Sequence, residues 1–116
     1  MIVIKLLLNK QNFSLVIKGH AQYNPGNDII CAGVSTITQT FSEIVSELGC
    51  SDIVSEDGLF EVNGNMNDDI LYYLRFVTVG YSGLTNSYPN NVRLEVIDED
   101  NILNIKKVVT YHRKPT

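Results

Sequence analysis

The order of apolar and polar positions predicts two strand pairs, each followed by a helix. Residues 2–8 and 13–19 are short runs rich in β-branched side chains around a polar turn, which predicts an antiparallel hairpin. Residues 52–55 and 59–63 repeat this pattern on either side of Glu56-Asp57-Gly58. Asp-Gly between two apolar runs favours a tight hairpin turn, so these residues predict a second hairpin.

Apolar residues at helical spacing predict two helices. The first is expected over 29–48, with Asp28 as its N-cap and Gly49 as its C-cap. The second is expected over 68–87 and ends before Pro89, because the residue before a proline avoids the helical conformation. The apolar stripes consist of Ile30, Val34, Ile37, Phe41, Ile44, Val45 and Leu48 in the first helix and Ile70, Leu71, Leu74, Val77, Tyr81 and Leu84 in the second.

The last quarter of the chain predicts one strand over 92–97, where apolar and charged residues alternate. An acidic turn at 98–100 follows, then a further edge strand over 102–111 and a basic tail. The predicted order is β-β-α-β-β-α-β, with an optional last β. This order indicates an α+β fold in which two helices pack on one face of a mostly antiparallel sheet.

The first predicted hairpin carries more apolar side chains than one sheet face needs. The residues concerned are Leu6, Leu8, Phe13 and Leu15. Burial of the surplus against a second copy of the chain would remove it from water, so we expect a homodimer.

Length and composition predict one globular domain, 1–116. The chain has 116 residues, of which 44% are hydrophobic and 19% charged, as is ordinary for soluble proteins. Its net charge of −4 does not favour direct binding of nucleic acid. No apolar run approaches the ~20 residues of a membrane span. Residues 2–8 lack the flanking features of a signal peptide and are interpreted as a strand.

The two cysteines are predicted to be reduced thiols. Cys31 lies at the start of the first predicted helix and Cys50 just past its end. A helix of this length spans about 30 Å, which is too far for a disulfide between them. Two cysteines in a chain of this size do not form a disulfide framework either. These observations favour an intracellular, cytoplasmic protein.

A histidine and a cysteine flank the loop between the first hairpin and the first helix. His20 stands at a strand end, within Gly19-His20-Ala21, and Cys31 stands in the first helical turn. The helix N-terminus and a nearby imidazolium both favour the thiolate, which is the nucleophilic form of cysteine. The pattern predicts thiol catalysis with His20 as base and acid and with the N–H groups of Cys31 and Ala32 as oxyanion donors. The loop between the pair, dense in turn formers, consists of Gln22, Tyr23, Asn24, Pro25, Gly26 and Asn27.

Asp28 has two uses that exclude each other. As a helix cap its carboxylate faces the backbone amides of the first turn, whereas as a third catalytic residue it orients His20. The sequence leaves both roles open, and we assign Asp28 an accessory role.

The second cysteine and the second histidine are expected to lie outside the chemistry. Cysteine is among the most buried residue types, so Cys50 is expected in the core, and His112 in a basic tail is expected to be exposed. Burial in the core is also the alternative for Cys31. A metal site is not expected, because the cysteines and histidines lack the spacing of a zinc motif.

The residues around His20 and Cys31 resemble the signature of a known family. The matching blocks are Gly19-His20-Ala21, Gly26, Asp28-Ile29-Ile30-Cys31-Ala32-Gly33-Val34-Ser35 and Tyr88-Pro89. They are similar to the bacterial ribosomal-processing cysteine protease family (Prp), and the likeness covers nearly the whole chain in length and element order. The family's catalytic histidine and cysteine match His20 and Cys31, and its aspartate matches Asp28. Ile30 and Gly33 replace a valine and an alanine of the family motif, outside the dyad.

The resemblance implies a cysteine endopeptidase that removes the short N-terminal extension of a large-subunit ribosomal protein, cutting after an aromatic residue. It implies a dimeric bacterial enzyme of the cytoplasm that needs no cofactor, contacts no membrane and closes the loop at 22–27 over its substrate. An alternative is a non-catalytic ribosome-associated binding module with the same fold. A third possibility is a dimeric structural protein that keeps Cys31 in its core.

Overall fold

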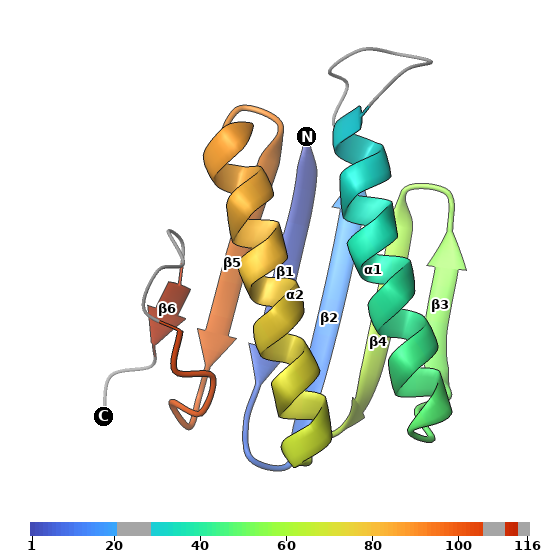
Figure 1. The fold of residues 1–116 in the computed structure, drawn as a ribbon, viewed down its shortest axis with the longest axis vertical. Coiled ribbons are helices and arrows are strands. Elements are labelled where there is room, and N and C mark those ends of the chain that lie inside the picture. Colours follow the sequence, from blue (N-terminus) through green and yellow to red (C-terminus); the bar gives the residue numbers. More distant parts are fainter. Residues whose placement is uncertain (21–28, 106–110, 114–116) are drawn as a thin grey trace.

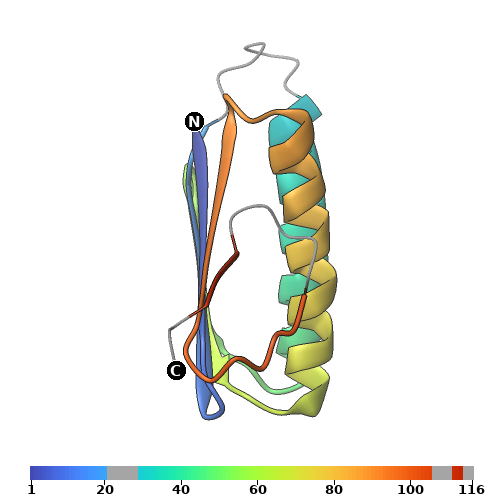
Figure 2. The ribbon, with the colours of Figure 1, turned by 90° about the vertical axis from the view of Figure 1, so that its left-hand side faces the viewer.

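Two helices lie against one face of a six-stranded sheet (Figure 1 and Figure 2). The computed structural model describes residues 1–20 and 29–105, and the backbone of 111–113. The helices are α1 (Ile29–Glu47) and α2 (Asp68–Ser87). The strands are β1 (Ile2–Leu8), β2 (Asn12–Gly19), β3 (Asp52–Glu56), β4 (Leu59–Asn65), β5 (Val92–Asp98) and β6 (Tyr111–Arg113). The α+β class and the predicted element order are confirmed.

The sheet is mixed and has the strand order β3-β4-β2-β1-β5-β6. The pairs β1–β2, β2–β4 and β3–β4 are antiparallel, whereas β1–β5 and β5–β6 are parallel. This register makes β2 and β3 run in one direction, and β4 and β5 in the other. Each helix is therefore a crossover between two strands of equal direction, as parallel strands require. As a result, α1 begins at the end of the sheet where β2 ends (Figure 1).

The core lies between the sheet and the helices. Leu6 pairs with Leu15 and Leu8 with Phe13 across β1 and β2, so all four side chains point to the helix-covered face. Each is at most 3% exposed, because α1 and α2 cover them. The apolar surplus on which we based the homodimer is therefore absorbed within one chain. The dimer itself stays a prediction without this support.

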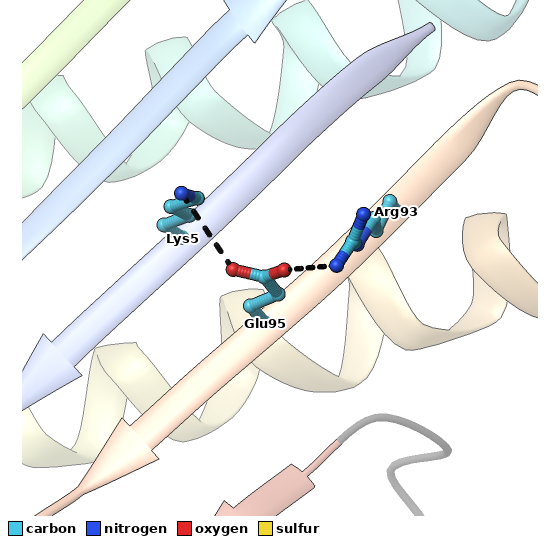
Figure 3. Close-up of polar contacts among 3 residues, drawn as sticks. All are labelled: Lys5, Arg93 and Glu95. Atoms are coloured by element: carbon cyan, nitrogen blue, oxygen red, sulfur yellow. Dashed lines mark ion pairs between the residues drawn. The ribbon is translucent and has the colours of Figure 1, made fainter.

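The other face of the sheet is mixed: it carries charged residues of β1 and β5 and also the exposed Leu7 and Ile97, which stand opposite each other. Lys5 and Glu95 stand directly opposite each other on β1 and β5, and their Nζ and Oε2 atoms lie 3.8 Å apart. Arg93 contacts the second carboxylate oxygen of Glu95 at 2.6 Å (Figure 3). Such solvent-exposed ion pairs contribute at most about 1 kcal/mol each.

The two helices contact each other through small and polar side chains. The hydroxyl groups of Thr38 on α1 and Tyr81 on α2 are hydrogen-bonded at 2.6 Å in a buried position. A Cβ at Gly80 would lie 3.0 Å from Ile37 Cδ1, so a glycine at this position allows the close approach of α1. Gly83 has no such neighbour and faces open space. Of the two glycines inside α2, only Gly80 serves the packing.

By length and hydropathy alone, α1 would qualify as a membrane span, contrary to our expectation that no segment does. Five of its residues are nevertheless buried in the domain: Ile30, Val34, Thr38, Phe41 and Val45. They form one stripe at helical spacing, which is the pattern of a helix packed on a core.

The edge strand predicted over 102–111 is wrong for residues 102–105, which the structure describes. Residues 102–105 are irregular, and the edge strand is Tyr111–Arg113, parallel to β5. The reason is Asp98, whose buried carboxylate accepts hydrogen bonds from the backbone N–H groups of Ile102 (3.0 Å) and Leu103 (2.7 Å). Arg75 on α2 also donates to the carbonyl oxygen of Leu103 at 2.9 Å. These bonds fold the segment back toward α2 instead of extending it along the sheet.

Candidate active site

Three segments meet at the end of the sheet where β2 finishes. They are the end of β2, the first turn of α1 and the tight turn between β3 and β4 (Figure 1). The crossover topology brings the first two together, because α1 starts where β2 stops. The third follows from register, since β4 runs antiparallel to β2 and Lys18 pairs with Leu59 at the start of β4. A pocket of about 310 Å³ opens between them.

The pocket holds both residues of the predicted pair. Cys31 contributes from the first turn of α1 and His20 from the position just after β2. Cys31 is a half-buried thiol at the edge of the core rather than a core residue. The apolar lining comes from Ile2, Ile17, Val34, Leu59 and Phe60, and the polar lining from α1 comes from Ser35, Thr38 and Gln39. An open pocket with a thiol and an imidazole in its wall has the components of a nucleophilic site.

His20 is held by its backbone and leaves its side chain accessible. Its carbonyl oxygen accepts a hydrogen bond from the backbone nitrogen of Met1. Gly19 before it has φ +95°, and a Cβ there would collide with the Met1 carbonyl oxygen, so only glycine fits. The imidazole is 56% exposed, and its Nε2 lies 3.8 Å from Oδ1 of Asp57 in the β3–β4 turn.

The remaining predicted site residues are placed as follows. Ala32 is exposed in the first turn of α1, next to Cys31. Asp28 and the predicted substrate loop from Gln22 to Asn27 lie outside the described residues. Asp57 was missed by the sequence analysis, which used Asp-Gly only as a turn signal. The signal that finds it is topological: a β4 strand paired with β2 must start beside the end of β2.

The charges on the pocket wall come from the β3–β4 turn. Glu56 and Asp57 line the pocket, and none of its described lining residues is a lysine or an arginine. Behind the wall, burial raises the pKa of Tyr81 far above its usual value, although the hydrogen bond with Thr38 acts in the opposite direction. Among the described residues, no group of three or more histidine, cysteine or acidic side chains is placed to bind a metal ion.

Cys50 lies away from this pocket. Its thiol donates a hydrogen bond to the carbonyl oxygen of Asn63 at 3.2 Å and packs against the core. It lines a separate pocket that also includes residues of β2 and β4, at the end of α1 opposite Cys31. Cys50 is half-buried rather than fully buried, and the side chain of His112 is outside the described residues.

Comparison with known proteins gives the same family as the sequence motif. The family model described as cysteine protease Prp matches residues 1–93. A crystal structure of the essential ribosomal processing protease Prp from S. aureus, in complex with a covalently linked product peptide, is 25% identical, with a TM-score of 0.73 over 83% of this chain and 99% of that one. The structure of SMU.848 from Streptococcus mutans is 20% identical, with a TM-score of 0.67 over 85% of this chain and 96% of that one. The comparison with curated proteins gave no match. The resemblance is thus confirmed, and the chain belongs to the cysteine protease Prp family.

Proposed function

We propose that this protein is a cysteine endopeptidase that removes the short N-terminal extension of a large-subunit ribosomal protein. The observation that carries the proposal is that Cys31 and His20 line the same pocket. Family membership supports the reaction class. The product peptide linked to the S. aureus protease supports a peptide substrate processed through a covalent bond.

In the proposed reaction, His20 removes the thiol proton of Cys31, and the thiolate attacks the scissile carbonyl carbon. The first-turn N–H groups at Cys31 and Ala32 stabilise the oxyanion, an effect worth about 3–4 kcal/mol per donor in a well-built site. The imidazolium then gives its proton to the leaving amine, which departs with the C-terminal product. A water molecule, deprotonated by His20, then attacks the thioester carbon and the C–S bond breaks. The N-terminal product leaves with a new carboxyl group, and the imidazolium returns its proton to the thiolate of Cys31. These steps need no cofactor.

The pocket lining supports cleavage after an aromatic residue. Ile17, Leu59 and Phe60 provide an apolar wall beside the thiol and the imidazole. We propose that this wall receives the aromatic side chain of the substrate and that the loop from Gln22 to Asn27 covers the bound peptide. Asp28 is proposed as an accessory residue, either as helix cap or as an orienting group for His20.

The proposed setting is the bacterial cytoplasm, with a ribosomal protein precursor as partner and a homodimer as the working state. A face of α2 with exposed Tyr72, Phe76 and Val79 is available for contact between copies. Light scattering of the purified protein measures the oligomeric state, and a monomer at micromolar concentration would contradict the dimer.

The central test is cleavage of the precursor and of a peptide that carries its extension. We expect Cys31→Ala to abolish cleavage and His20→Ala to lower kcat by about 10²–10⁴-fold, the usual range for loss of a general base. The chain supplies matched controls, because Cys50→Ala and His112→Gln remove the other thiol and the other imidazole. Both are expected to keep near wild-type activity.

Alkylation by iodoacetamide separates the protease from the alternative binding module. An activated Cys31 is labelled faster near neutral pH than Cys50, and His20→Ala removes the difference. Wild-type cleavage by Cys31→Ala would refute the mechanism. Equal, slow labelling of both thiols together with no cleavage would favour a non-catalytic module of this fold.

A further inference from the structure

The imidazole of His20 is seated on the turn between β3 and β4. Its Nε2 lies 3.8 Å from Oδ1 of Asp57, and a Cβ at Gly58 would lie 3.1 Å from the same nitrogen. The backbone at position 58 has φ +73°. Nε2 of His20 is therefore turned toward the hairpin and lies next to the Asp57 carboxylate. A side chain larger than that of glycine at position 58 would crowd this nitrogen.

The backbone ties this turn to the histidine. The N–H of Gly19 donates to the carbonyl oxygen of Gly58 at 2.9 Å, just before His20. The ladder continues from there, with Lys18 opposite Leu59 and Ile17 opposite Phe60. Main-chain hydrogen bonds thus hold the end of β2 beside the turn and place the backbones of His20 and Asp57 next to each other.

The surroundings of Nε2 decide which ring nitrogen of His20 can accept the thiol proton. When Nε2–H faces a carboxylate, the neutral ring keeps its lone pair on Nδ1, and this nitrogen can accept a proton from a thiol. A carboxylate at Nε2 also stabilises the imidazolium that forms when the thiolate appears. The 3.8 Å separation is longer than a hydrogen bond, but catalytic contacts are often long without substrate and shorten on binding.

We propose that Asp57 is a positioning residue that holds His20 with Nε2 toward the β3–β4 turn and Nδ1 available to the thiol of Cys31. This inference rests on the proposed protease function. The bond changes are those of the proposed reaction: the proton moves from Sγ to Nδ1 and later from Nδ1 to the leaving amine, and Asp57 exchanges no proton. Asp57 touches neither the thiol nor the scissile bond.

The competing explanation for Asp57 is purely structural, because Asp-Gly is a preferred pair in two-residue hairpin turns. Asn-Gly is equally favoured there. The substitution Asp57→Asn therefore keeps the turn and removes the charge, which separates the two explanations. The side chain of Asp57 is 98% exposed, so its replacement opens no cavity.

The test measures kcat and KM of the full chain on the peptide that carries the ribosomal extension. We expect Asp57→Asn to lower kcat about tenfold, less than the ~100-fold that a 1 Å misplacement costs, with KM within about twofold of wild type. Asp57→Glu, which keeps the charge, is expected to recover part of kcat. Asp52→Asn at the other end of β3 is the matched control, as an exposed aspartate outside this pocket, and is expected to retain wild-type kinetics.

A second readout does not depend on cleavage. The ¹⁵N shifts of the His20 imidazole, assigned with His112→Gln, report which nitrogen carries the proton in the neutral ring. We expect a larger share of the Nε2–H form in the wild type than in Asp57→Ala. If the wild type cleaves and Asp57→Asn has wild-type kcat, or only KM rises, the positioning role is wrong. If the wild type fails to cleave, the proposed function fails, whereas the tautomer measurement still decides whether Asp57 orients the ring.

Discussion

The hydroxyl oxygens of Thr38 and Tyr81 lie 2.6 Å apart, and this contact joins the wall of the pocket that holds Cys31 and His20 to the second helix. Thr38 is on α1, two turns after Cys31, and lines the pocket at 4% exposure. Tyr81 is 1% exposed on α2. The bond between the two hydroxyl groups is buried. This pair is one of the buried contacts that hold α1 against α2.

Tyr81→Phe is expected to destabilise the protein by about 1–3 kcal/mol, because it leaves the buried Thr38 hydroxyl without this partner. Thr38→Val removes the other half of the same bond. The double variant is expected to be more stable than the sum of the two losses predicts, since neither hydroxyl then remains to be satisfied. Urea unfolding of the four proteins gives this coupling free energy, and additive losses would contradict the pairing.

Burial of Tyr81 predicts how stability responds to alkaline pH. Burial raises the pKa of Tyr81 above that of an unfolded tyrosine, which is about 10. The folded state therefore holds the phenol proton more tightly, so its contribution is complete below pH 10 and falls as the pH rises further. We expect the stability difference between wild type and Tyr81→Phe to shrink between pH 8 and pH 11. A constant difference in urea unfolding across that range would refute this assignment.

Local sequence signals were sufficient to predict most of the helices and strands. The predicted bounds of β1 and α2 coincide with the structure, because polar turns and an Asn67 cap mark their ends, and Asn67 accepts from the Ile70 N–H at 2.9 Å. Strand and helix periodicity also placed Cys31 at the edge of the core. These features are encoded within a few residues of where they occur.

Two contacts were not evident from the sequence. Asp98 was predicted only as part of an acidic turn, yet its carboxylate is buried and accepts hydrogen bonds from the backbone N–H groups of Ile102 and Leu103. Asp57 reaches His20 only through the pairing of β4 with β2, between residues 37 apart in the chain. The spacing of apolar residues along the chain does not reveal this pairing, because it does not indicate which strands are neighbours in the sheet.

Asp98→Ala is expected to cost about 3–5 kcal/mol of stability. It removes two short hydrogen bonds to a charged acceptor, each worth about 1.5–3 kcal/mol, at a site that is 0% exposed. Glu99→Ala, an exposed neighbour in the same turn, is expected to change stability by less than about 0.5 kcal/mol. Thermal and urea unfolding compare the two variants, and equal effects would show that the buried carboxylate does not hold the segment.

Gly58→Ala is expected to impair catalysis more than stability. The backbone at Gly58 has φ +73°, so an alanine there costs about 1–2 kcal/mol, and its Cβ would lie 3.1 Å from Nε2 of His20 and displace the ring. Gly49→Ala provides the matched control, because Gly49 has φ +97° but no atom within 4 Å of the added Cβ. The strained backbone lowers the stability of both variants by a similar amount, so any extra loss of kcat in Gly58→Ala comes from the contact with the imidazole. Equal kcat values for the two variants, at temperatures where both are folded, would mean that the turn does not set the position of His20.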